Sequence, residues 1–160
     1  MSGFDPARFR ELCGRFVTGV AVVTTVDAES RPVGMTINSF TSVSLSPALV
    51  SMNIDHGAEL YRLLTSTPRF AINMLQSGQE SLARKFAESH PDRFDGLGWQ
   101  MSPRGNPVLD GVLAVIECDS HARFAAGDHT IVVGQVVAGT TFPGRPLVYF
   151  RGGYHDAELG

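Results

Sequence analysis

Apolar side chains near the start of the chain recur at the three- and four-residue spacing of one helix face. These positions are Phe9, Leu12, Cys13 and Phe16. The Asp5-Pro6 pair before them is typical of a helix start, with an N-cap aspartate and a proline in the first turn. The pattern predicts an amphipathic helix that ends at Thr18-Gly19.

Beyond this helix, short β-branched and apolar runs alternate with turn residues. Residues 20–25 are almost entirely β-branched or small, which predicts a strand buried on both faces. In residues 34–40 the polarity alternates, so Thr36 and Asn38 share one face of a strand while Met35 and Ile37 share the other. Further strands are expected at 49–54, 70–75, 112–119, 130–137 and 147–151.

Two further short helices are expected between the strands. The first begins near residues 55–57 and ends at Pro68, and the second follows a Ser77–Glu80 sequence that resembles a capping box. Residues 90–111 are rich in Gly, Pro, Asp and Arg and predict a long ordered loop. The whole pattern predicts a mainly β fold of the α+β class: one domain over residues 1–160, with about six or more strands in a small barrel and short helices packed outside.

Composition narrows the classes of partner and compartment. The net charge is −3, with one lysine and no basic cluster, which argues against nucleic acid or an anionic membrane as a partner. The sequence has neither an apolar run of about 18 residues nor an apolar signal core, so a cytoplasmic location is expected. Cys13 and Cys118 are expected to be buried reduced thiols, and the spacing of His and Cys suggests no metal site.

Two segments are candidates for a ligand-binding or catalytic site. Residues 34–44 combine five hydroxyls with the Asn38 amide, which suits a neutral heterocycle or a phosphate, and equally suits a Ser/Thr-rich edge strand. In Gly127-Asp128-His129 the aspartate could orient or charge the imidazole, or the segment could simply be a hairpin turn. The sequence contains no dinucleotide-binding G-x-G-x-x-G after a strand, no P-loop and no C-x-x-C, so these site types are not indicated.

The order of several motifs along residues 9–154 resembles the short flavin reductase family, the reductase components of two-component flavin-dependent monooxygenases. The matching segments are Arg15–Thr24, Gly34–Leu45, Phe70–Leu75, Phe86-Ala87, Arg93-Phe94, Pro107–Leu109, Gly127–His129 and Leu147–Tyr154, together with Gln79 and Gly134. The resemblance implies an FMN-binding split barrel, a homodimer, and reduction of free FMN or FAD by NADH or NADPH for a partner monooxygenase.

The resemblance also implies which positions bind the ligands. The implied flavin contacts are Thr36, Ile37, Asn38, Ser39, Ser42, Val43, Ser44, Asn53, Ala71, Asn73, Gln79 and Tyr154. His129 would lie near the nicotinamide, with Asp128 orienting its ring. The segment Asn53–His56 is less basic than the family's usual loop, which leaves the contacts to the flavin phosphate open.

Two other functions remain open from the sequence. Hydride transfer between a nicotinamide and a flavin needs no side-chain nucleophile, so a flavin-binding protein without reductase activity would show the same residues. An oxidoreductase related to pyridoxamine-phosphate oxidase is the other alternative, although the chain lacks a basic phosphate clamp.

Overall fold

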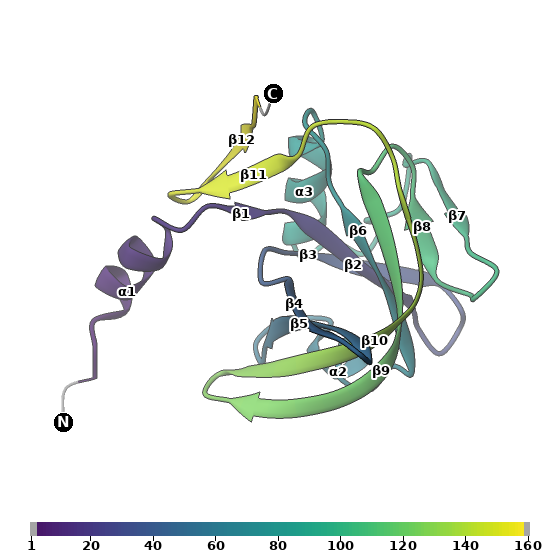
Figure 1. Ribbon diagram of the computed structural model, residues 1–160, viewed down its shortest axis with the longest axis horizontal. Helices are drawn as coiled ribbons and strands as arrows, with labels where there is room; N and C mark the ends of the chain where they lie inside the picture. The colour runs from purple at the N-terminus through teal and green to yellow at the C-terminus, as the bar shows by residue number, and fades with distance from the viewer. Residues whose placement is uncertain (1–2, 159–160) are drawn as a thin grey trace.

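Antiparallel strands form the main sheet of the computed structural model, which describes residues 3–158 (Figure 1). The order across this seven-stranded sheet is β3-β2-β6-β9-β10-β5-β4. The strands are β2 (Ala21–Val26), β3 (Pro32–Ile37), β4 (Thr41–Leu45), β5 (Ala48–Asp55), β6 (Arg69–Met74), β9 (Ala114–Ala126) and β10 (His129–Thr141). The prediction of a mainly β fold is confirmed.

The short link between β3 and β4 explains why the sheet is curved. These strands are the two edges of the sheet, although only residues 38–40 separate them in sequence. If the sheet were flat, steps of about 4.8 Å between neighbouring strands would place its edges about 29 Å apart. The link from Ile37 to Thr41 can span at most about 15 Å. The sheet must therefore curl until its edges approach, which gives a barrel split between β3 and β4.

Buried side chains form two clusters on the two faces of β2 and β6. One cluster joins these strands to β5 and β10 and includes Met52, Phe70 and Ile72. The other packs the opposite face against α3 (Glu80–Ala87) and includes Val22 and Phe86. Ala21 through Thr25 are all buried, which confirms the prediction of a strand covered on both faces.

Smaller sheets flank the barrel. One consists of β1 (Thr18–Gly19), β11 (Leu147–Phe150) and β12 (Gly153–Asp156), and the other is the hairpin of β7 (Trp99–Met101) and β8 (Pro107–Leu109). The segment predicted as a long loop, residues 90–111, thus contains two short paired strands. The prediction also missed β12, because a strand of four residues beside a turn has no alternation to read.

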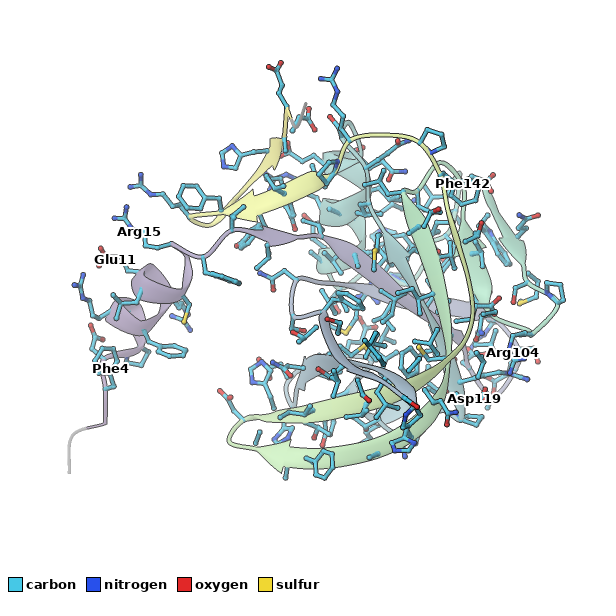
Figure 2. The ribbon with its side chains drawn as sticks, viewed as in Figure 1. Phe4, Glu11, Arg15, Arg104, Asp119 and Phe142 are labelled. Atoms are coloured by element: carbon cyan, nitrogen blue, oxygen red, sulfur yellow. The ribbon has the colours of Figure 1, made fainter. Side chains whose placement is uncertain are left out.

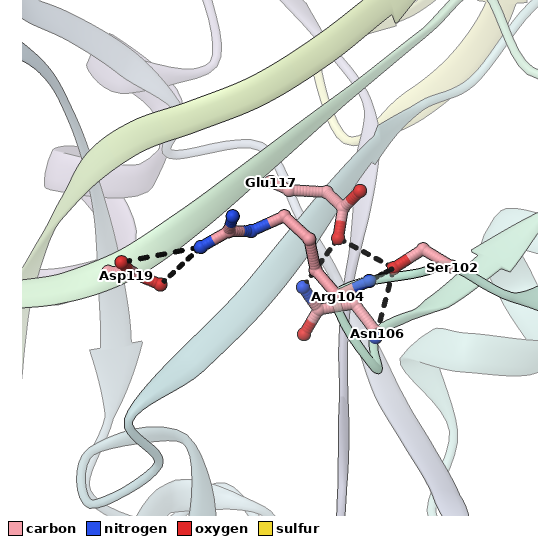
Figure 3. Close-up of polar contacts among 5 residues, drawn as sticks. All are labelled: Ser102, Arg104, Asn106, Glu117 and Asp119. Carbon is pink, nitrogen blue, oxygen red and sulfur yellow. Dashed lines mark hydrogen bonds and ion pairs between the residues drawn. The ribbon is translucent and has the colours of Figure 1, made fainter.

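A buried carboxylate ties the β7–β8 hairpin to β9 (Figure 3). Glu117 Oε2 accepts hydrogen bonds of 2.7 Å from both Ser102 Oγ and Asn106 Nδ2. Nearby, Arg104 Nη2 lies 3.3 Å from Asp119 Oδ1. These contacts hold the hairpin against the outer face of the barrel and away from the split.

Helix α1 (Pro6–Cys13) lies apart from the barrel and is shorter than predicted (Figure 1). Its N-cap is as expected, since the Asp5 carboxylate accepts from the backbone N–H groups of Ala7 and Arg8 at 3.2 Å. The expectation that both cysteines are buried is wrong for Cys13, which is exposed because this helix does not pack into the core. Helix α2 (Tyr61–Leu64) follows β5 and precedes β6 in the sequence. None of the helices in residues 3–158 has the length and hydrophobicity of a membrane span.

Candidate functional site

A cavity of about 420 Å³, which we call the split cavity, opens where β3 ends. Its lining comes from the end of β3, the segment before α2, the end of α3 and the β11–β12 hairpin. The residues most relevant to chemistry are Thr36, Ile37, Asn38, Glu59, Arg93 and Tyr154. The fold therefore brings together four of the positions implied to bind flavin, although Tyr154 is far from the others in sequence.

The β3 residues of the split cavity differ in how free their side chains are. The Thr36 hydroxyl donates to the Ala83 carbonyl at 2.6 Å, so it fixes β3 to α3. Ile37 is buried and supplies an apolar wall. Asn38 is exposed, and its amide makes no hydrogen bond to the described residues 3–158, which leaves a donor and an acceptor free for a ligand.

An ion pair closes one side of the split cavity. The Arg93 side chain is only 10% exposed, and its Nη2 lies 2.8 Å from Glu59 Oε2. The same carboxylate oxygen accepts from Ser89 Oγ at 2.6 Å. The hydrogen bond from Ser89, together with the charge of Arg93, lowers the pKa of Glu59 below its ordinary value. The two charges cancel, so this wall offers no net charge to a ligand.

Two tyrosines form the wall of the split cavity on the side of β11 and β12. The rings of Tyr149 and Tyr154 lie 5.3 Å apart, and the Arg84 guanidinium lies 5.2 Å above the Tyr154 ring. Burial raises the pKa of Tyr154, so its hydroxyl stays protonated at neutral pH. The wall thus offers flat aromatic surface beside a neutral hydroxyl, a surface suited to a planar heterocycle.

A second cavity, of about 770 Å³, lies between α1 and the barrel, and we call it the helix cavity. Its walls include Arg10, Ser39, Thr41 and Asn53. Asn38 and Tyr149 line both cavities, so the two spaces adjoin at the split of the barrel. Ser39 Oγ accepts from the Asn53 backbone N–H at 2.9 Å, which fixes the segment after β3 against β5.

The Asp128-His129 pair lies at the tip of the β9–β10 hairpin. Asp128 Oδ1 accepts from His129 Nδ1 at 2.7 Å, and Nε2 of the same ring has no hydrogen-bond partner in residues 3–158. This hydrogen bond lowers the pKa of Asp128. His129 pairs with Asp55 on β5, two residues before Gly57 of the split cavity, so the hairpin lies beside the cavity without lining it.

The fold does not bring every implied flavin contact to these two cavities. Ala71 and Asn73 are fully buried in β6, in the core between the barrel and α3. The Gln79 amide accepts from the Gln76 backbone N–H and so supports the start of α3. The remaining implied contacts, Ser42, Val43 and Ser44, lie on the edge strand β4 beyond both cavities.

Several cavity residues were not among those identified from the sequence. Arg10, Glu59 and Tyr149 come from segments where charge or aromaticity is ordinary for a helix face, a loop or a strand. Closure of the barrel brings Glu59 and Tyr149 to the split, and the position of α1 beside the barrel brings Arg10 to the helix cavity. Arg93 and Tyr149 do lie within motifs that the family resemblance contains, and that was the one available signal for them.

Comparison with known proteins identifies the family. The model of the flavin reductase like domain family matches residues 13–158. The NADH-dependent FAD reductase of Streptomyces globisporus is 44% identical over 93% of this chain and 84% of its own length. The structure of the S. globisporus NADH:FAD oxidoreductase SgcE6 with NAD and FAD fragments superposes with a TM-score of 0.90 at 38% identity, covering 98% of this chain and 97% of that one.

Some relatives are longer than this chain. A reductase subunit of stachydrine N-demethylase, Stc3 of Rhizobium meliloti, is 43% identical over 94% of this chain, which spans 66% of that protein. The chain spans half the length of another R. meliloti relative. Whatever the further segments of those proteins do, the match over residues 13–158 shows that this chain belongs to the flavin reductase family.

Proposed function

We propose that this protein uses NADH or NADPH to reduce free FMN or FAD and supplies the reduced flavin to a partner monooxygenase. The observation that carries the proposal is the split cavity, where Thr36, Ile37 and Asn38 meet Tyr154. Relatives that are named NADH-dependent FAD reductase and reductase subunit of a demethylase support the reaction and the partner class.

The walls of the split cavity fit a flavin ring. Ile37 and Phe86 provide apolar surface, and the tyrosine pair provides a face for stacking. The free amide of Asn38 can donate and accept, as the polar edge of an isoalloxazine requires. We assign the flavin contacts of this chain to the implied positions that line the two cavities. These are Thr36, Ile37, Asn38, Ser39, Asn53 and Tyr154.

Bound flavin supplies the hydride acceptor, so the reaction requires no side-chain nucleophile. The chain contributes by holding two planar rings in contact and by limiting the access of water between them. The Glu59–Arg93 ion pair and the protonated Tyr154 keep the cavity free of net charge. A cavity with such a wall favours binding of the neutral ring of a ligand over binding of its charged phosphate group.

We assign His129 to the nicotinamide. Its Nδ1 is bound to Asp128, so Nε2 is free to accept a hydrogen bond from the nicotinamide carboxamide. Loss of one such bond corresponds to about a two- to tenfold change in binding. His129→Ala should therefore raise the KM for NADH by about that factor, while flavin affinity stays at the wild-type value.

Exposed apolar side chains near the N-terminus support a homodimer as part of the proposal. Phe9 is 58% exposed, Leu12 48% and Phe16 78%, all in one short segment beside the helix cavity. A second copy of the chain would cover these side chains and shield the cavity from water. Sedimentation that shows a monomer at micromolar concentration, with or without flavin, would contradict the homodimer.

Oxidation of NADH in the presence of FMN, FAD or riboflavin, each in turn, tests the reaction. We expect turnover with at least one flavin, and a higher KM for NADH in His129→Ala. The matched control is His121→Ala, which removes an exposed histidine from the middle of β9. If wild-type protein binds flavin but does not consume NADH or NADPH, the chain is a flavin-binding protein and the proposed reaction is wrong.

A further inference from the structure

The helix cavity and the split cavity differ in charge. In the split cavity, Arg93 is neutralised by Glu59 at 2.8 Å. The helix cavity has one arginine in its lining, Arg10, and no carboxylate. Arg10 forms no ion pair with any side chain in residues 3–158. The helix cavity is therefore the electropositive end of the joined space.

The neighbouring charges on α1 do not neutralise Arg10. Glu11 follows it in sequence, but Glu11 Oε2 lies 2.6 Å from Arg8 Nη1 and its Oε1 lies 3.7 Å from Arg15 Nη2. Glu11 on α1 and Arg15, two residues beyond the end of the helix, lie close together (Figure 2). With that carboxylate shared between two other arginines, the guanidinium of Arg10 remains available to a ligand anion.

We infer that Arg10 binds the phosphate end of the flavin and that the flavin spans both cavities, with its ring in the split cavity. This inference rests on the proposed function. Asn38 and Tyr149 line both cavities, so one elongated ligand can occupy the two spaces at once. The neutral ring of such a ligand matches the split cavity, and its anionic tail matches the electropositive helix cavity.

The chemistry at the helix cavity suits a phosphate. A guanidinium can donate two parallel hydrogen bonds to phosphate oxygens. The exposed hydroxyl of Thr41 and the exposed amide of Asn53 line the same cavity and can donate further bonds. Arg10 thereby supplies the positive charge that the segment Asn53–His56 lacks, and it does so from a part of the chain remote in sequence.

Flavin titrations with paired ligands and paired variants test the inference. FMN and riboflavin share the ring and the ribityl chain, but only FMN carries the phosphate. We expect Arg10→Gln to weaken FMN binding about tenfold or more, which corresponds to about 1.4 kcal/mol, and to change riboflavin binding less than about twofold. Arg10→Lys should restore part of the FMN affinity, because it restores the charge without the paired donors.

Arg8→Gln is the matched control, because it removes an arginine of the same helix that is paired with Glu11. It should leave both affinities at the wild-type values. Equal losses for FMN and riboflavin in Arg10→Gln would overturn the inference, since a general distortion of α1 does not depend on the phosphate. Unchanged FMN affinity would overturn it as well. Failure of wild-type protein to bind either flavin would instead contradict the proposed function.

Discussion

Asn73 tests whether a buried polar side chain of this fold stabilises the protein or binds the flavin. Its side chain is fully buried in β6, and Nδ2 donates to the Val22 carbonyl and to Thr24 Oγ1, both at 3.0 Å. Oδ1 accepts from the Leu109 backbone N–H at 2.9 Å. One amide thus connects β6 to β2 and to β8, and all of its donors and its acceptor are in use within the protein.

The cost of removing this amide follows from those contacts. Three hydrogen bonds at about 1 kcal/mol each contribute about 3 kcal/mol. Asn73→Ala also leaves the Leu109 N–H buried without its partner, and such a group costs about 1–3 kcal/mol. We therefore expect a loss of about 4–6 kcal/mol in the free energy of unfolding. For a chain of this size, that loss corresponds to a Tm lower by about 8–24 °C.

Thermal melts and flavin titrations of two variants separate this structural role from a role in binding. Asn73→Ala should lower the Tm strongly and leave the flavin affinity of the folded protein unchanged. Asn53→Ala, at an exposed amide that lines the helix cavity, should do the reverse. If Asn73→Ala instead weakened flavin binding with an unchanged Tm, the assignment of its amide to the core would be refuted.

Further predictions concern packing, thiol reactivity and pH. Gly134→Ala should lower the free energy of unfolding by about 1–3 kcal/mol in urea melts, because a Cβ there would lie 2.6 Å from Phe70 Cζ; an unchanged midpoint would contradict this. A thiol reagent should label the exposed Cys13 and spare Cys118, because burial raises the pKa of the Cys118 thiol to about 12. Mass spectrometry that finds both cysteines labelled in the native protein would contradict this prediction. Glu59→Gln should lower the free energy of unfolding at pH 7. The difference from wild type should shrink below pH 4.5, because a carboxyl with a lowered pKa contributes stability only while it is ionised. A difference in the free energy of unfolding that is independent of pH would refute this prediction.

The elements that the sequence predicts well are those whose signal is local. Strand β2 has five buried residues in succession because both of its faces are covered, and this produces a continuous β-branched run. The N-cap of α1 is likewise encoded in adjacent residues. In contrast, β4 was not predicted as a strand, because its five residues are largely exposed and its identity depends on pairing with β5. An edge strand with polar faces leaves little trace in a hydrophobic pattern.

The candidate site was only partly predictable, because closure of the barrel places neighbouring polar residues of one run, residues 34–44, in different cavities or on the edge strand. Thr36 and Asn38 line the split cavity, Ser39 and Thr41 line the helix cavity, and Ser42 continues onto the edge strand. In the sequence these residues look equivalent, since all carry small polar side chains. What separates them is the constraint that residues 38–40 must connect the two edges of a curled sheet. The same constraint makes Asn38 common to both cavities, so its position at their junction is set by topology rather than by any motif around it.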